Sequence, residues 1–215
     1  MTLQRVALAT FGIIVGFLFS VGSATTVVAQ SRLTDAELAK ALVRGGHVIV
    51  MRHAAADPDK ADTDPLNFAN IRRQQPLTEG GKASARAFGE AMRRLGVKFE
   101  AVLTSRFNRA VQTAVLAGFA DPKPSLALTE GSLVVSPNEN RNRAVMLRQI
   151  MGQPVTPGFN RLLISHRANL AQALGREWYE VKEGEASIFK VDNGAYTLVA
   201  RVQIDEWPRI ASQGK

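Results

Sequence analysis

Residues 47–53 read HVIVMRH, an apolar run that ends directly in Arg52 and His53. An unbroken apolar run of this length is typical of a strand that is buried on both faces. Two more such runs follow, FEAVLT at 99–104 and RLLIS at 161–165. Segments with helical spacing of apolar residues separate the runs. We therefore predict an α/β domain with a three-layer α/β/α arrangement and a mostly parallel central sheet.

The segments between these strands have recognisable start and stop signals. Residues 34–37 (TDAE) have capping-box spacing and predict a helix that stops at the glycine pair 45–46. The segment 54–76 has no clear period and predicts a long loop, a length that usually carries function. The other expected elements are helices at 78–95, 105–118 and 138–151, a short strand at 126–129, and a closing hairpin of 188–191 with 196–202.

The first 30 residues have the layout of a secretory signal peptide: one arginine, an apolar stretch at 6–21, and small residues after it. We expect cleavage after Ala29, with Ala24 as the alternative. A signal peptide over 1–29 would leave a single domain over 30–215, located in the periplasm or secreted. The apolar stretch is shorter than the roughly 20 residues of a spanning helix, so an uncleaved leader is the one membrane contact that the sequence allows.

Composition narrows the kinds of partner. The formal net charge is +8, with lysine and arginine spread along the chain. This pattern does not indicate a nucleic-acid partner, and it suits either an anionic substrate or a solvated basic surface. The chain has no cysteine, which excludes disulfides and thiolate metal sites. No oligomeric state can be predicted from these features.

The three apolar strands each end in polar or cationic residues. In open α/β sheets, ligands bind beyond the carboxyl ends of the strands, so Arg52, His53, Arg109 and His166 are expected in one crevice. Two imidazoles and two guanidiniums favour phosphoryl transfer, since arginine matches phosphoryl oxygens bidentately and a neutral imidazole is a competent nucleophile. His53 is the natural nucleophile.

Neither a metal nor another cofactor is expected at this crevice. The loop 54–76 carries four aspartates, at positions 57, 59, 62 and 64, but it lacks the glycine and terminal glutamate spacing of a calcium-binding EF-hand loop. We interpret these aspartates as a solvated acidic loop.

Four motifs, in order, resemble the histidine phosphatase family, also called phosphoglycerate-mutase-like proteins. They are the first strand with its Arg-His end, LTEG at 77–80, SRFNRAVQTA at 105–114, and ISH at 164–166. The resemblance runs from about residue 47 to 202. It implies that His53 is phosphorylated during turnover, that Arg52, Arg109 and His166 hold the phosphoryl oxygens, and that Ser105 lies beside them or at the strand end. The implied activity is that of a phosphoric monoester hydrolase.

The chain departs from the family pattern at two positions, with Ala54 after the nucleophile and Arg167 after the second histidine, where glycine is usual. The motifs of the acid-phosphatase and phytase branch are missing, which disfavours phytase activity. The resemblance implies that Glu130 is the general acid, and Glu183 and Glu185 are its rivals. The substrate would be a phosphorylated small molecule or a phosphoprotein. Two alternatives stay open: a phosphomutase, and a catalytically silent phosphate-binding module on the same fold.

Overall fold

A computed structural model describes residues 33–131 and 133–213 of the chain. The predicted signal peptide and both of its cleavage sites lie outside the described residues. The described residues form one compact unit. No helix in the described ranges is both long enough and apolar enough to span a bilayer.

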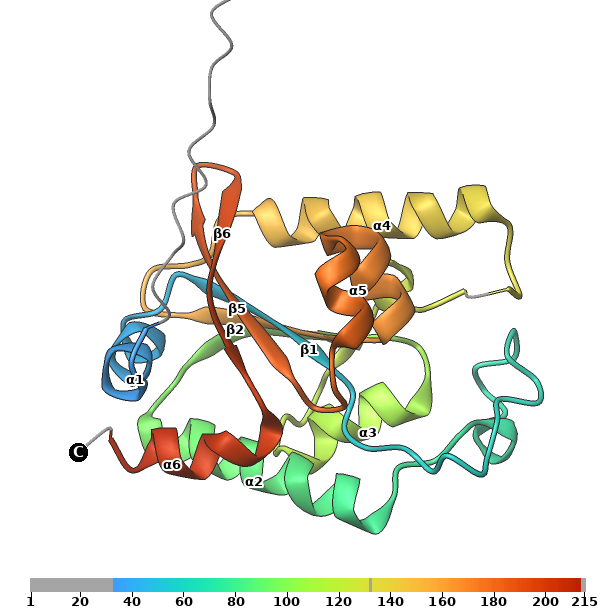
Figure 1. Cartoon of the computed structure of the whole chain (residues 1–215), viewed down its shortest axis with the longest axis horizontal. Helices are drawn as coiled ribbons and strands as arrows, with labels where there is room; N and C mark the ends of the chain where they lie inside the picture. Colours follow the sequence, from blue (N-terminus) through green and yellow to red (C-terminus); the bar gives the residue numbers. More distant parts are fainter. Residues whose placement is uncertain (1–32, 132, 214–215) are drawn as a thin grey trace, which may run out of the picture. The chain divides into compact units, whose positions relative to one another are not determined.

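A single six-stranded sheet forms the middle layer (Figure 1). Its order is β3-β2-β4-β1-β5-β6. Neighbours from β3 to β1 pair in parallel, while β5 is antiparallel to both β1 and β6. The strands are β1 (His47–Arg52), β2 (Phe99–Thr104), β3 (Lys123–Pro124), β4 (Asn160–Ser165), β5 (Ala186–Asp192) and β6 (Ala195–Val202). The predicted mostly parallel α/β fold is confirmed.

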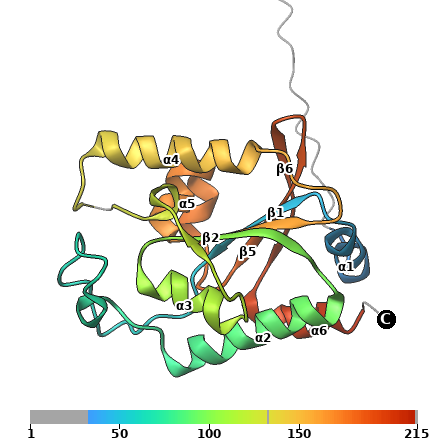
Figure 2. The same ribbon diagram turned by 180° about the vertical axis from the view of Figure 1, so that it is seen from behind.

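Helices cover both faces of the sheet, and the two views in Figures 1 and 2 agree on their placement. One face packs against α1 (Asp35–Arg44), α2 (Glu79–Leu95), α3 (Asn108–Leu116) and α6 (Trp207–Ala211). The other face packs against α4 (Pro137–Gly152) and α5 (Arg167–Leu174). Each interface has its own hydrophobic core, with Phe88 and Trp207 in the first and Leu147 and Phe189 in the second.

The structure contains the helix cap and the hairpin turn that the sequence predicts. The capping box before α1 is formed, because the Thr34 hydroxyl accepts from Glu37 N and the Glu37 carboxylate accepts from Thr34 N. The β5–β6 hairpin turns at Asn193 and Gly194, whose φ angles of 47° and 83° are those that a tight two-residue turn requires.

The loop between β1 and α2 is closed at its base. Asp57 N donates to Pro76 O, Thr78 N donates to Ala55 O, and residue 56 forms an isolated antiparallel bridge with residue 77. Helix α2 begins so close to this base that a Cβ on Gly81 would lie 2.1 Å from Ala55 O, and only glycine fits there. The segment 54–76 otherwise contains one short 3₁₀ turn, η1 (Ile71–Arg73).

The strand predicted at 126–129 is wrong. These residues form a 3₁₀ turn, η2 (Leu126–Leu128), and the short edge strand β3 precedes it. The carbonyls of Ala127 and Leu128 accept from the side chains of Asn169 and Ser165, so their hydrogen bonds do not belong to a strand ladder. Periodicity cannot separate a short buried strand from a short buried turn.

One helix start and two whole helices also differ from the prediction. Helix α3 starts at residue 108 and not 105, because the Ser105 hydroxyl accepts from Phe107 N and forms a turn before the helix. Helices α5 and α6 were not predicted. The remaining short 3₁₀ segments are η3 (Arg176–Glu180) and η4 (Ile204–Glu206).

Candidate active site

The carboxyl ends of β1, β2 and β4 lie side by side, as the register shows. Arg52 is paired with Ser165, and Thr104 with Ile164. The next residue of β1 continues this alignment, since His53 N donates to Ser165 O at 3.0 Å. The sheet therefore places His53 and His166 next to each other, with ring centroids 5.0 Å apart.

The imidazole of His53 has the tautomer that a nucleophile needs. Its Nδ1 lies 2.8 Å from Ala54 O, which can only accept, so Nδ1 carries the proton. The other nitrogen, Nε2, is then a lone-pair acceptor, and Arg109 Nε donates to it at 3.3 Å. Burial lowers the pKa of His53 well below 6.5, and electrostatic interactions with His166 and with the charged Arg109 add to this effect. His53 is therefore neutral near pH 7.

The imidazole of His166 is buried with unused hydrogen-bonding capacity. The residue is 1% exposed, and neither ring nitrogen has a hydrogen-bond partner among the described residues. Glu130 Oε1 is 3.2 Å from Nδ1, but the direction of this contact does not fit a hydrogen bond. Burial, with the charges of Arg109 and Arg52, holds the pKa of His166 well below 6.5. Unpaired buried nitrogens are costly, so a water or a ligand is expected to satisfy them.

Arg109, on α3, connects the acidic and imidazole groups of the site. Its side chain is 2% exposed. Nε reaches His53, Nη1 donates to both oxygens of Asp62 at 2.9 and 3.0 Å, and Nη2 donates to Glu130 Oε1 at 2.7 Å. One helical turn later, the Thr113 hydroxyl donates to Arg109 O and accepts from Ala54 N. This hydroxyl fixes α3 against the chain that follows the nucleophile.

Arg52 lies on the other side of the histidines. Nη1 donates to Val181 O at 3.0 Å and Nη2 to Glu183 Oε1 at 3.1 Å, while the buried Nε has no partner in the described ranges. Burial lowers the pKa of Arg52, although the carboxylate of Glu183 opposes this shift. The positive charge of Arg167 also acts on this guanidinium, so the residue that departs from the family pattern adds a cation near the site.

The structure brings together five of the six residues predicted for the site: Arg52, His53, Arg109, Glu130 and His166. Ser105 is at the end of β2, but its hydroxyl is used in the turn before α3.

Of the two rival acids, Glu185 is buried and accepts from Arg201, Gln203 and Lys182 N, which indicates a structural role. Glu183 lies at the site through its ion pair with Arg52.

Two contributors were not found from the sequence. Asp62 was interpreted as part of a solvated acidic loop, and this is wrong: its side chain is 18% exposed and it accepts from Arg109 and from Gln75 N. Phe107 packs edge-on against the His166 ring at 5.4 Å, and the Arg109 guanidinium carbon lies 4.5 Å from its ring centre. No local motif distinguishes either residue, since only the loop path brings Asp62 to Arg109.

The described residues contain no cluster of three or more His, Cys, Asp or Glu side chains that could hold a metal ion.

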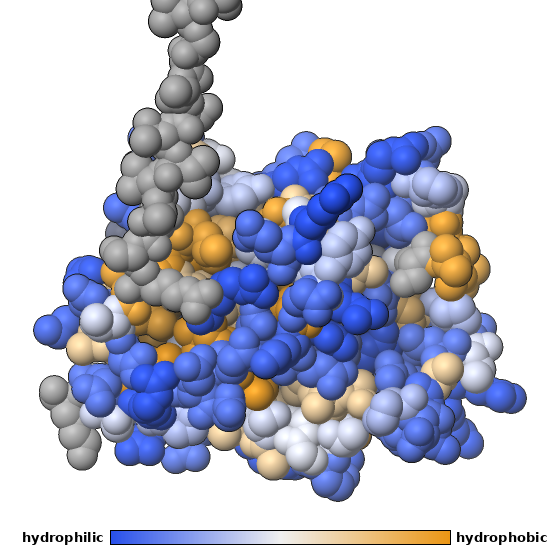
Figure 3. Space-filling view, in the orientation of Figure 1, coloured by the Kyte–Doolittle hydropathy of each residue, from blue (hydrophilic) through white to orange (hydrophobic). Residues whose placement is uncertain are grey.

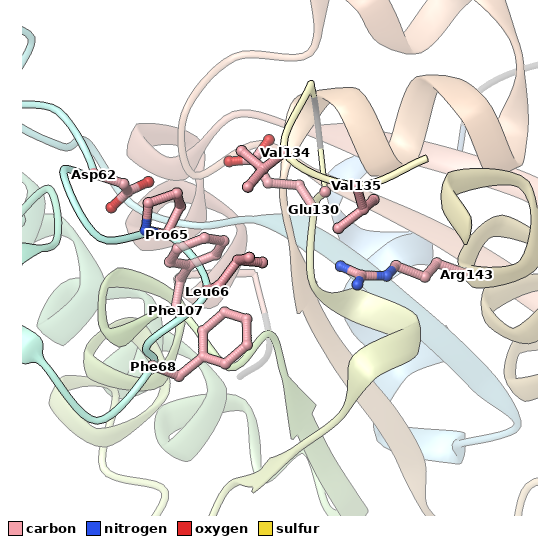
Figure 4. A pocket seen from close by; sticks show the side chains of 10 residues that line it. Asp62, Pro65, Leu66, Phe68, Phe107, Glu130, Val134, Val135 and Arg143 are labelled. Atoms are coloured by element: carbon pink, nitrogen blue, oxygen red, sulfur yellow. The ribbon is translucent and has the colours of Figure 1, made fainter. Parts of the chain in front are cut away.

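A pocket of about 220 Å³ lies next to the acidic side of the site (Figure 4). Glu130 and Asp62 form the part of its wall that also contacts Arg109. Most of the remaining wall is apolar, and Arg143 from α4 extends into it. The pocket and the histidine pair therefore share two carboxylates.

An α/β domain that gathers two histidines and two arginines at its strand ends is the arrangement that the sequence motifs predict. Residues 48–131 match the model of the histidine phosphatase superfamily (branch 1), and phosphatases are among the solved structures that share the fold. The resemblance recognised from the motifs is therefore confirmed. No curated protein matches the chain.

Three of the similar solved structures illustrate the likeness. The protein histidine phosphatase SixA, complexed with tungstate, has a TM-score of 0.54 and 21% identity over 74% of this chain and 98% of its own. A mycobacterial glucosyl-3-phosphoglycerate phosphatase with VO3 has a TM-score of 0.51 and 16% identity over 72% and 97%. A phosphoserine phosphatase variant from Entamoeba histolytica, with phosphoserine, has a TM-score of 0.51 and 14% identity over 74% and 97%. At these identities the likeness is one of fold.

Proposed function

We propose that this protein is a metal-independent phosphohydrolase that works through a phosphohistidine on His53. The observation that carries the proposal is the state of the two histidines. His53 presents a neutral acceptor nitrogen beside Arg109, and the neighbouring His166 has two buried nitrogens without partners. A phosphoryl group at this point would receive hydrogen bonds from His166, Arg109 and the unused Nε of Arg52.

The first chemical step follows from this geometry. Nε2 of His53 attacks phosphorus and forms a P–N bond, while the bond from phosphorus to the ester oxygen breaks and leaves its electron pair on that oxygen. A protonated Glu130 gives its proton to the leaving oxygen, so an alcohol departs.

The second step returns the enzyme to its initial state. A water attacks the phosphorus, and Glu130, now a carboxylate, accepts one of its protons. The P–N bond breaks, its electrons return to Nε2 of His53, and inorganic phosphate leaves. Division of one displacement into two easier ones is the general advantage of covalent catalysis. Throughout, the arginines balance the charge on the phosphoryl oxygens, and the neutral His166 donates a hydrogen bond to one of them.

The nucleophile is tested by His53→Ala, which we expect to abolish turnover of p-nitrophenyl phosphate and to prevent trapping of a phosphoenzyme. The matched control is His47→Ala, since His47 is the third histidine of the chain and starts β1, away from the strand ends of the site. This variant should keep its activity if its thermal unfolding shows a folded protein. Phosphoenzyme formation in His53→Ala would contradict the proposal. Release of inorganic phosphate from a sugar phosphate, without a rearranged ester, distinguishes a hydrolase from a mutase.

The acid is tested by Glu130→Gln with two kinds of ester. Alkyl phosphates need a proton on the leaving oxygen, so we expect a loss of roughly a hundredfold or more, within the range of general acid catalysis. p-Nitrophenyl phosphate has a leaving group that departs unprotonated, so its loss should be small. Equal losses on both esters would remove Glu130 from proton transfer and direct attention to Glu183, the other carboxylate at the site.

A further inference from the structure

We infer that the pocket beside Glu130, the leaving-group pocket, binds a small apolar body that carries an anionic substituent at its far end. The inference rests on the proposed function for its placement. Glu130 can protonate only an oxygen that it touches, so the leaving group lies on the Glu130 side of the phosphoryl group. On that side, Glu130 lines this pocket and lies 3.2 Å from His166 Nδ1, and Asp62 lines the pocket while it is paired with Arg109.

The chemistry of the wall selects against sugars. Phe68 and Phe107 meet edge to face, with ring centroids 5.2 Å apart. A hydroxyl-rich leaving group would lose water against these apolar side chains without finding partners among them, which is costly. The apolar residues of the wall are Pro65, Leu66, Phe68, Phe107, Val134 and Val135.

The rim of the pocket is apolar surface that no described residue covers. Leu66 is 64% exposed and Val134 is 46% exposed. Figure 3 shows hydrophobic surface at the right of the view, beside the N-terminal end of α4, where the segment 133–135 leads into that helix. An apolar group in the pocket would cover this rim and remove it from water, which favours binding.

The size of the pocket limits the occupant. Sites for drug-sized ligands enclose about 300–1,000 Å³, and this pocket has about 220 Å³. One aromatic ring or a short branched chain fits that volume, whereas a disaccharide or a nucleoside does not. The occupant is therefore a single small group next to the phosphate ester.

The far end of the pocket is cationic. Arg143 has a side chain that is 7% exposed, with Nε donating to Glu139 Oε1 and Nη1 to Thr129 O. Figure 4 shows its guanidinium reaching from α4 toward the apolar wall. Within the described ranges, the one carboxylate paired with it is that of Glu139, whose side chain is 37% exposed. A carboxylate on the occupant would meet a preorganised guanidinium, which binds such groups strongly.

Binding of three phosphonates tests the inference without requiring turnover. Methylphosphonate, benzylphosphonate and 4-carboxybenzylphosphonate share one head group and differ only in what enters the pocket. By calorimetry, we expect the ring to tighten binding at least tenfold and the carboxylate to tighten it about tenfold more. Equal affinities for the methyl and benzyl probes would overturn the inference that the pocket binds an apolar group. Equal affinities for the two benzyl probes would overturn the inference that its far end binds an anionic substituent.

Two variants test which residues produce the gains in affinity from the ring and from the carboxylate. Val134→Ser should reduce the benzyl-over-methyl ratio roughly tenfold, because a loss of apolar contact in a pocket is worth about that factor. The matched control is Val145→Ser on α4, a valine of similar exposure, 43%, outside the pocket wall, and it should leave the ratio unchanged.

Arg143→Met should remove the gain in affinity that the carboxylate of the probe provides, and it should keep the gain in affinity that the ring provides. If the wild type shows both gains but does not hydrolyse p-nitrophenyl phosphate, then the proposed function fails while the pocket stands.

Discussion

Replacement of Asp62 by asparagine should tighten the binding of phosphate and its mimics. Both carboxylate oxygens of Asp62 accept from Nη1 of Arg109, at 2.9 and 3.0 Å, and this nitrogen is one that a bound phosphoryl group would use. An anionic ligand must therefore compete with an anion that the protein supplies. Asparagine keeps the shape of the side chain but removes its charge, and Glu130 still pairs with the buried guanidinium.

The expected change in affinity follows from the strength of the Asp62–Arg109 contact that the substitution weakens. A hydrogen bond to a charged group contributes about 1.5–3 kcal/mol, and 1.4 kcal/mol corresponds to a factor of ten. Since the amide oxygen of asparagine can still accept, we take the lower end and expect the inhibition constant of vanadate to fall about tenfold. The assay measures competition between vanadate and p-nitrophenyl phosphate. The ionic strength is kept fixed, because salt screens both the attraction of the anions to Arg109 and the charge of Asp62.

The control for this experiment is Asp59→Asn. It removes one carboxylate charge from the same loop at an exposed position, and its backbone contact to Asp57 does not depend on its side chain. This variant should leave the inhibition constant unchanged. If Asp62→Asn binds vanadate more weakly than the wild type, then Asp62 orients Arg109 for the ligand and does not compete with it, and the reasoning is refuted.

Three further predictions concern pH, metals and the leader. Because burial depresses the pKa of His53 and His166 below 6.5, the acidic limb of kcat/KM should lie below pH 6.5, and a half-maximum above that value would contradict the proposed nucleophile. The unfolded imidazoles bind protons at a higher pH than the folded ones, so the free energy of unfolding should fall in acid titrations as the pH drops below about 6.5. Activity should survive EDTA, and loss that added metal restores would refute a metal-independent mechanism. Mass spectrometry of exported protein should find an N-terminus at Gln30, whereas an intact N-terminus in the membrane fraction would indicate an anchor.

The sequence predicted the sheet and most of the site because both depend on short-range patterns. Each apolar strand was recognisable by its own residues, and the rule that ligands bind at the carboxyl ends of strands brought His53 and His166 together without knowledge of the strand order. The register then confirmed the arrangement, with Arg52 paired to Ser165.

The features that were missed depend on long-range contacts. Asp62 reaches Arg109 through the path of a loop that has no repeating pattern, so its ion pair could not be read from spacing. The turn at 126–128 looked like a strand because its residues form a short apolar run. The side chains that satisfy its carbonyls come from α5 and the end of β4, which are distant in sequence. The predicted role of Ser105 in substrate binding stays a prediction: its hydroxyl accepts from Phe107 N and keeps its own proton to donate.

The closed base of the loop 54–76 has a consequence for how this protein could diversify. The two ends of the loop are fastened to each other by backbone hydrogen bonds near Ala55 and Pro76, while its outer part contributes Asp62 and the wall residues Leu66 and Phe68. A different outer segment that keeps a carboxylate for Arg109 could be exchanged on the same base without disturbing the sheet or the histidines. Selectivity would then evolve as an interchangeable module, separately from the catalytic machinery, and grafted loops offer a direct route to engineer it.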